Sequence, residues 1–132
     1  MTPQAREHLA RADRLLGAAR LLVERAYPAD SVSRSYYAMF HAATAVLLER
    51  GIERSSHKGV ISAFGEFLVK PGHLSTQLHA SFRKAFDARQ EDDYLASPSE
   101  TPDKAALLLK EAQEFVAACQ RLLEAPKQQG TS

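Results

Sequence analysis

Three polar side chains capable of chemistry lie in a stretch of sequence that is otherwise apolar. Tyr36, Tyr37 and His41 fall within residues 35–48, which carry no formally charged side chain, and Arg34 directly precedes them. A phenol can donate or accept a hydrogen bond, and an imidazole can take up or release a proton near neutral pH. The same groups also occur in protein cores as satisfied hydrogen-bond partners, so both interpretations are open at this point.

A second set of candidates follows this stretch, where another helix is expected to begin. Ser55, Ser56, His57 and Lys58 would bring together free backbone N–H groups, a cation and an imidazole, which suits a phosphate group. An ordinary helix cap is the simpler interpretation of the serines. Because burial in an apolar helix disfavours the imidazolium form of His41, the more accessible His57 is the better candidate for a base.

Positive charge is local rather than general in this chain. The 17 basic and 16 acidic side chains give a net charge of +1, so no global field would attract nucleic acid. A nucleotide or RNA contact would have to come from a local patch, and an ordinary solvated helix face explains such a patch about as well. Two basic clusters qualify, namely Arg50 with Arg54 and Lys58, and Arg83 with Lys84 and Arg89.

Several other kinds of active site are disfavoured by residue types and spacing. The 5 histidines include no pair three or four residues apart, and Cys119 is the only cysteine. No serine has the context of a nucleophile elbow, and the scattered glycines form no phosphate-binding loop. We therefore expect no metal site, no cofactor and no covalent nucleophile.

The length and composition are those of one globular domain. The chain has 132 residues, of which 45% are hydrophobic and 25% charged, and we expect a single domain over residues 1–132. Its core should span residues 3–124, followed by a polar tail at 125–132. No uncharged run reaches the roughly 20 residues that a membrane span needs, and the N-terminus lacks the pattern of a signal peptide. The simplest expectation is a cytoplasmic protein.

The first half of the chain has the pattern of two helices. Apolar residues at alternating three- and four-residue spacing indicate a helix that begins at Pro3 and continues to about Ala26, because Pro28 stops it. Asp30 or Ser31 is expected to cap the second helix, which ends near Gly51. Since this second helix is apolar on more than one face, we expect it to be buried on more than one face.

A third helix is expected from near His57 to a stop at Pro71. Gly59 and Gly65 lie inside it, and each lowers the helix propensity by about 1 kcal/mol relative to alanine. These glycines would be explained by a close crossing with another helix.

Ser75 is expected to cap a fourth helix, whose apolar stripe leads to Arg89 before a loop begins at about Glu91. A charged residue in line with an apolar face is unusual, and the alternative is that Arg89 lies at the helix end and extends to water. A final helix is expected from a cap at Thr101 to about Glu124. No segment alternates with the period of a strand, so the predicted fold is all-α, an up-and-down bundle of four to five helices.

Two segments of the sequence are similar to a known family. The string YPADSVSRSYYAMFHAATAVLLERGIERSSHKGV and the later FRKAFDARQEDDY, with the final helix, resemble the HEPN superfamily, the higher-eukaryote and prokaryote nucleotide-binding domain. The similarity is to small stand-alone prokaryotic members and covers residues 5–124. It implies an up-and-down helical bundle that pairs as a homodimer.

The resemblance also implies a type of active site. Many members of the superfamily are metal-independent ribonucleases that act as toxins beside a minimal nucleotidyltransferase. Their motif is an arginine, then a histidine after four to six residues, often followed by a tyrosine. The matching segment here runs from Arg89 to Tyr94, and acidic residues replace the histidine. The motif tyrosine is modified by the transferase in related pairs, which makes Tyr94 the corresponding residue.

Three functions are compatible with this resemblance. The leading hypothesis is a nucleotide-binding or interaction partner of a minimal nucleotidyltransferase, with Arg89, Asp93 and Tyr94 lining a groove near the dimer axis. The alternative is an active ribonuclease toxin that combines Arg89 with His57 or His41. The Arg34–His41 and Arg50–His57 pairs have the motif spacing, with six intervening residues each. A non-catalytic dimeric scaffold is the third hypothesis.

Overall fold

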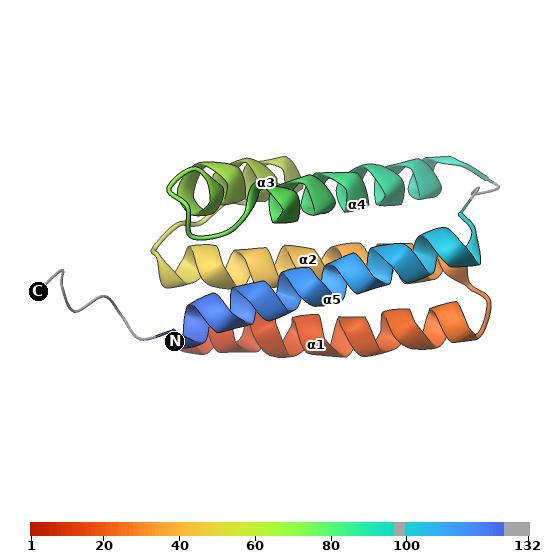
Figure 1. Ribbon diagram of the computed structural model, residues 1–132, viewed down its shortest axis with the longest axis horizontal. Coiled ribbons are helices and arrows are strands. Elements are labelled where there is room, and N and C mark those ends of the chain that lie inside the picture. Colours follow the sequence, from red (N-terminus) through yellow and green to blue (C-terminus); the bar gives the residue numbers. More distant parts are fainter. Residues whose placement is uncertain (97–99, 126–132) are drawn as a thin grey trace, which may run out of the picture.

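The computed structural model describes residues 1–96 and 100–125, which form helices joined by short connections (Figure 1). In chain order these are α1 (Pro3–Glu24), α2 (Pro28–Glu49), α3 (His57–Phe64), the π-helical segment η1 (Gly65–Val69), α4 (Thr76–Tyr94) and α5 (Pro102–Glu124). No strand occurs in the described residues, so the predicted all-α class is confirmed. Within the same residues, no helix is long and apolar enough to cross a membrane. Most of the predicted tail, residues 126–132, lies outside the described part.

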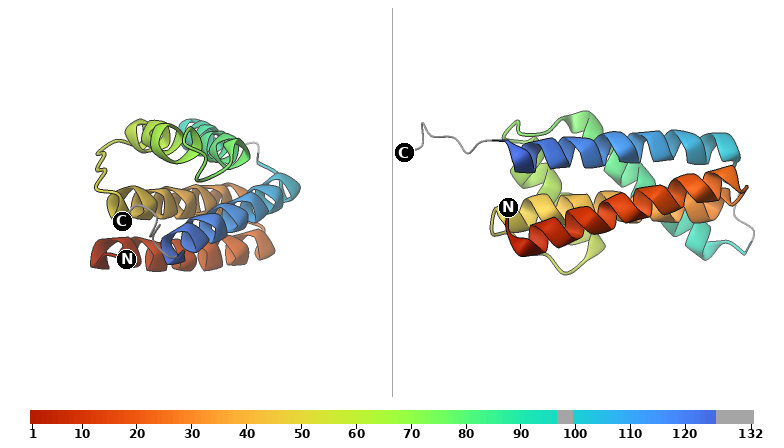
Figure 2. Two further views of the ribbon diagram at one scale, coloured as in Figure 1. Left: turned by 60° about the vertical axis from the view of Figure 1, so that its left-hand side comes forward. Right: turned by 90° about the horizontal axis from the view of Figure 1, so that it is seen from below.

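The central element of the bundle is α2. It contacts α1, α3, α4 and α5, with α3 and α4 on one side and α1 and α5 on the other (Figures 1 and 2). The helices α1, α2, α4 and α5 run alternately up and down, while α3 and η1 connect α2 to α4 (Figure 1). The buried residues of α2 are Ser31, Val32, Ser35, Tyr36, Ala38, Met39, Ala42, Ala43, Ala45, Val46 and Leu47. These positions occupy more than one face of the helix, as predicted.

The connection between α1 and α2 differs from the prediction. The first helix ends at Glu24 instead of near Ala26, and α2 begins directly at Pro28. Proline is well tolerated at the first helical position because its missing N–H has no partner there in any case. Neither Asp30 nor Ser31 is therefore the cap. The hydroxyl of Ser31 instead donates a hydrogen bond of 2.7 Å to the Ala19 carbonyl and ties the two helices together.

The third helix is also shorter than predicted. Ser56 caps it as expected, because its Oγ accepts a hydrogen bond of 2.9 Å from the Gly59 N–H, but α3 gives way to the π-helical η1 at Gly65. A Cβ atom on Gly65 would lie only 2.5 Å from Cε1 of His79 on α4. The missing side chain thus allows the close crossing, and His79 Nε2–H donates to the Ile61 carbonyl at 2.9 Å.

The fourth helix is longer than predicted. Ser75 caps it, but the helix continues to Tyr94 where a loop was expected from Glu91. An ion pair of 2.9 Å between Arg89 and Asp93, one turn apart, supports this last stretch. The cap of α5 at Thr101 and the end of α5 at Glu124 agree with the prediction.

Two histidines link α1 to α2. The Nδ1 atoms of His8 and His41 lie 2.9 Å apart, and the two rings stack with their centroids at 5.1 Å. One ring must donate and the other accept, so the contact needs at least one neutral imidazole. Burial, then the charges of His8 and Arg11, lower the pKa of His41 to about 4, and burial lowers the pKa of His8 against the opposing effect of Glu7.

Replacing Gly65 by alanine should destabilise the fold. The added Cβ would displace the His79 ring and its hydrogen bond to the Ile61 carbonyl, whereas a Cβ on Gly17 of α1 would meet no other described residue within 4 Å. We expect Gly65→Ala to be less stable than Gly17→Ala by about 1–3 kcal/mol, a typical overpacking cost. Urea unfolding measures both, and equal free energies of unfolding would contradict the proposed contact.

Stability should fall as the pH drops below neutrality. Because the folded pKa values of His8 and His41 lie below the unfolded value of about 6.5, the unfolded chain binds more protons between about pH 4 and 6.5. The free energy of unfolding then increases with pH in this window. Asp92, whose pKa is raised to about 6 by burial and then by Glu100, acts in the opposite direction.

The contribution of the histidine pair is isolated by comparing variants, since Asp92 is common to all of them. We expect wild type to lose more unfolding free energy between pH 7 and pH 5 than His41→Gln. The matched control is His73→Gln, which removes an exposed imidazole. A His41→Gln protein with the wild-type pH dependence in urea unfolding would refute the assignment.

Candidate functional site

Arg89 is held against the two tyrosines of α2. Its guanidinium carbon lies 5.0 Å from the ring centre of Tyr37 and 5.8 Å from that of Tyr36. Its side chain is only 22% exposed, and it pairs with the more exposed Asp93 at 2.9 Å. The aromatic faces attract the cation, which explains a charged residue in line with an apolar stripe. Arg89 therefore does not extend to water at a helix end.

His57, at the start of α3, lies against the same tyrosine. Its Nδ1 atom is 2.6 Å from the Tyr36 hydroxyl, and its ring stacks on Phe40 with centroids 4.5 Å apart. Burial, then the positive charge of Arg89, lowers the pKa of His57. A neutral imidazole at pH 7 can accept a proton, as a general base requires.

Tyr36 connects the arginine and the histidine. Its side chain is completely buried, and its ring is surrounded by the rings of Phe40, Phe82 and Phe86 with centroids 5.7–6.2 Å away. Burial, opposed by Arg89, raises the pKa of its phenol, so the hydroxyl keeps its proton. Sequence reasoning named Tyr36 together with Tyr37 and His41, either for chemistry or as satisfied hydrogen-bond partners of the core. Spacing carries no signal for the Tyr36–His57 contact, which joins two helices.

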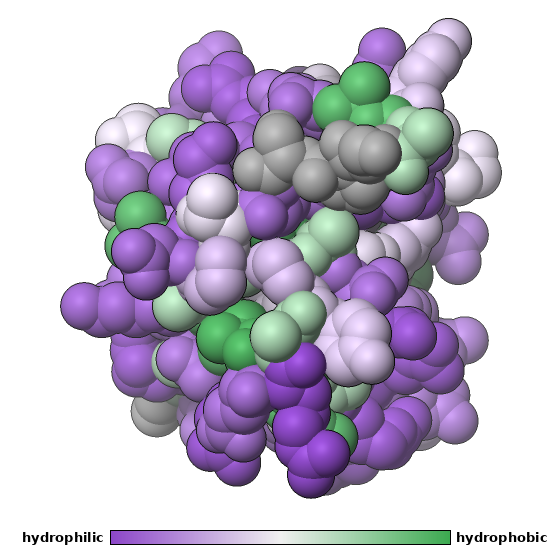
Figure 3. All heavy atoms as spheres, turned by 90° about the vertical axis from the view of Figure 1, so that its right-hand side faces the viewer, coloured by the Kyte–Doolittle hydropathy of each residue, from purple (hydrophilic) through white to green (hydrophobic). Residues whose placement is uncertain are grey.

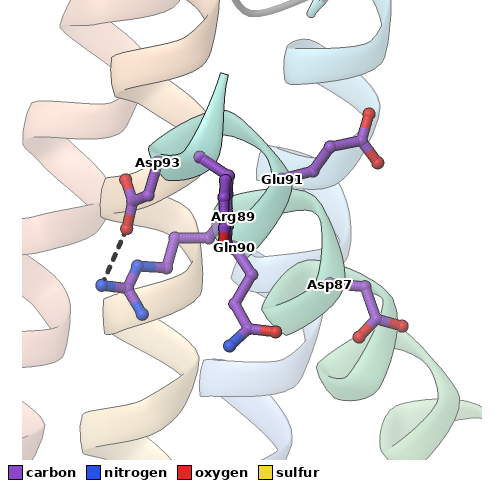
Figure 4. A pocket seen from close by; sticks show the side chains of 6 residues that line it. Asp87, Arg89, Gln90, Glu91 and Asp93 are labelled. Atoms are coloured by element: carbon purple, nitrogen blue, oxygen red, sulfur yellow. Dashed lines mark ion pairs between the residues drawn. The ribbon is translucent and has the colours of Figure 1, made fainter. Parts of the chain in front are cut away.

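An open pocket of about 660 Å³ lies beside this cluster (Figure 4). The guanidinium of Arg89 turns toward Asp93, while Asp87 and Glu91 spread away from it along α4. The remaining lining residues are Gln90 and Tyr94. Sequence reasoning predicted Arg89, Asp93 and Tyr94 as a group, and the structure brings these three residues together.

Tyr94 is a highly exposed part of the pocket lining. It is the last residue of α4, and 91% of its side chain is exposed. Figure 3 views the bundle from the end on the right of Figure 1, where apolar groups are separated by hydrophilic ones. No ring contact or hydrogen bond to another described residue holds the phenol of Tyr94. The hydroxyl is thus free to meet another molecule.

The other predicted site residues lie elsewhere. His41 is engaged with His8, Arg34 is exposed, and Arg50 follows the end of α2. Arg54 donates to the Glu53 carbonyl at 2.7 Å and lies over the ring of Phe67. The first basic cluster is not one site, because Arg54 and Lys58 line different pockets.

The second basic cluster is divided as well. Lys84 is bound by Glu111 of α5 at 2.9 Å, Arg83 lines a groove with Lys58, and Arg89 faces the tyrosines. Among the residues that the structure describes, no group of three or more histidine, cysteine, aspartate or glutamate side chains is placed to hold a metal ion. The group that combines a possible proton acceptor with a cation is that of Tyr36, His57 and Arg89.

Known proteins share this sequence over most of its length. The HEPN domain family matches residues 5–122. A UPF0332 protein of Gloeobacter violaceus is 36% identical over 124 residues, which cover 93% of this chain and 98% of the relative. A protein of Methanocaldococcus jannaschii named "Putative toxin MJ0605" is 33% identical over 113 residues, covering 86% and 84%. A UPF0332 protein of Thermotoga maritima is 31% identical over 114 residues, covering 86% of each.

These matches agree with the resemblance seen in the YYAMFHAA and ARQEDDY segments. They extend over the helices that carry Tyr36, His57 and Arg89, so the whole described cluster falls inside the matched region. The chain therefore belongs to the HEPN domain family.

Proposed function

We propose that this chain is the HEPN member of a toxin–antitoxin-type pair and the partner of a minimal nucleotidyltransferase that modifies Tyr94. The observation that carries the proposal is the 91% exposure of Tyr94 beside the Arg89–Asp93 ion pair. Relatives that are named as putative toxins support the toxin–antitoxin context. The homodimer that the family resemblance implies for this chain remains a prediction.

The proposed modification follows from the chemistry of an accessible phenol. The Tyr94 oxygen attacks the α-phosphorus of a nucleoside triphosphate held by the transferase, the bond to pyrophosphate breaks, and the phenolic proton passes to a base. The new phosphodiester carries a negative charge next to the guanidinium of Arg89, which can bind it by charge-assisted hydrogen bonds. The attached nucleotide would then occupy the Arg89 pocket.

Removal of one hydroxyl tests this proposal. We expect wild type, incubated with the transferase encoded beside it and with ATP, to gain the mass of at least one nucleotide, and Tyr94→Phe to gain none. The matched control is Tyr27→Phe, because Tyr27 is also exposed, at 56%. Intact-protein mass spectrometry gives the result. Equal labelling of Tyr94→Phe and wild type would overturn the assignment of Tyr94, and an unlabelled wild type would overturn the partnership.

A second candidate function is metal-independent cleavage of RNA. The specific observation in its favour is the cluster of Tyr36, His57 and Arg89, in which a hydrogen bond of 2.6 Å orients the imidazole. His57 would take the proton of a ribose 2′-hydroxyl, whose oxygen attacks the adjacent phosphorus while the bond to the 5′-oxygen breaks. The 5′-oxygen leaves with a proton from solvent, and Arg89 stabilises the charge on the phosphate.

Cleavage of a labelled RNA in the presence of EDTA tests this second candidate. We expect His57→Ala and Arg89→Ala to lower the rate by about 10²–10⁴-fold, the usual range for a proton-transfer group or a charge-stabilising donor. Tyr36→Phe should lower the rate without changing RNA affinity, because it removes only the hydrogen bond that orients the His57 imidazole. The controls are His73→Ala and Arg14→Ala, which remove exposed groups outside the cluster. If wild type leaves the RNA intact, this candidate fails.

A further inference from the structure

A groove of about 720 Å³ lies between the α3–η1 segment and α4. Three exposed cations line it from separate elements: Lys58 on α3, Lys70 just after η1, and Arg83 on α4. Within the described residues, none of the three forms a salt bridge. Lys84, the neighbour of Arg83, is by contrast bound to Glu111. The described part of the chain thus leaves three positive charges unpaired around one hollow.

The inner wall of this groove is apolar. Ile61, Val69 and Phe86 contribute to it, and each is buried or half-buried. A cationic rim over an apolar wall suits a chain with an anionic backbone and flat, unstacked bases. A duplex would offer only its phosphates to such a surface, because its bases are stacked inside. The combination therefore favours a single strand.

The crossing of α3 and α4 gives the groove a defined shape. Gly65 and His79 both line it, and the missing Cβ of Gly65 leaves the space that the His79 ring fills. Since Nε2 of His79 donates to the Ile61 carbonyl, Nδ1 is the ring nitrogen that remains for another molecule. The π-helical segment η1 begins at this point, and such segments are frequent at functional sites.

The groove adjoins the cluster of Tyr36, His57 and Arg89. Lys58 directly follows His57, and the ring of Phe86 lies 6.4 Å from the His57 ring. Asp87 borders both the groove and the Arg89 pocket. A strand that fills the groove can therefore continue from Lys58 and Phe86 to the imidazole and the guanidinium.

We propose that the groove between α3–η1 and α4 binds single-stranded RNA and leads it to His57 and Arg89. The inference rests on the second candidate function, in which RNA is the substrate. Two carboxylates, Glu66 and Asp87, also line the groove and oppose phosphate binding. Together with Lys58, Lys70 and Arg83 they give the groove a net formal charge of +1. Because the carboxylate of Asp87 repels phosphate, its removal should strengthen RNA binding.

Fluorescence anisotropy of a short labelled RNA strand at several salt concentrations tests the groove. We expect the triple variant Lys58→Gln, Lys70→Gln, Arg83→Gln to bind more weakly and to reduce the slope of log K against log salt by about 2, at roughly 0.7 per phosphate contact. Asp87→Asn should bind more tightly than wild type. The matched control is Arg14→Gln, Arg20→Gln, Lys110→Gln, which removes three exposed cations from α1 and α5.

The failure of the groove and the failure of the proposed function are distinguishable. If the groove variant and the control variant bind RNA equally well, the groove assignment is wrong while cleavage by His57 and Arg89 is unaffected. If wild type does not bind RNA, both the groove and the RNA-cleaving candidate are wrong, and labelling of Tyr94 is a separate result. The proposal would also be overturned if duplex RNA bound as tightly as the single strand, or if a DNA strand bound more tightly. It would be overturned as well if a mononucleotide at the same phosphate concentration displaced the labelled RNA.

Discussion

The burial of α2 on more than one face is the constraint on which the rest of this structure depends. A helix that buries Tyr36 and Leu47 on one face and Ala38 and Ala45 on the opposite face cannot lie on the surface of a two-helix layer. It requires α1 and α5 on one side and α3 and α4 on the other, as Figures 1 and 2 show. Each fully buried large side chain contributes about 1.5–3 kcal/mol, so this arrangement is the main source of stability.

The same burial leads three polar side chains of α2 to partners inside the protein, although the buried hydroxyl of Ser35 has none among the described residues. Ser31 bonds to the Ala19 carbonyl, His41 to His8, and Tyr36 to His57. An unpaired buried polar group would cost about 1–3 kcal/mol, which explains why each of these contacts joins α2 to a residue on another helix. The contact of Tyr36 differs from the other two because its partner, the His57 imidazole, lies close to the positive charge of Arg89. In the proposed RNA-cleaving site, the candidate base and the core packing of α2 would therefore depend on the same hydrogen bond.

Local sequence signals predicted the parts of the fold that depend on neighbouring residues. The caps at Ser56, Ser75 and Thr101 satisfy backbone N–H groups three residues away, so spacing alone identifies them. The contact of Tyr36 with His57 depends on the crossing of two helices, which periodicity does not encode. The end of α4 was missed although its signal is local, because Arg89 and Asp93 have the i, i+4 spacing of a helical ion pair but stand in a charged run that is also typical of a loop.

The ion pair of Arg89 and Asp93 orients the arginine without blocking it. Asp93 is 56% exposed, so solvent screens the pair on the carboxylate side, and ion pairs one helical turn apart are typically worth about 0.3–0.5 kcal/mol. A phosphate that binds the guanidinium through two charge-assisted hydrogen bonds gains more than this, so it can displace the carboxylate. The guanidinium carbon lies 5.0 Å from the ring centre of Tyr37 and 5.8 Å from that of Tyr36, so both rings can keep attracting the cation when the carboxylate leaves. The tyrosine pair thus fixes the position of Arg89. The side of the guanidinium that Asp93 contacts is the side on which an anion could replace the carboxylate.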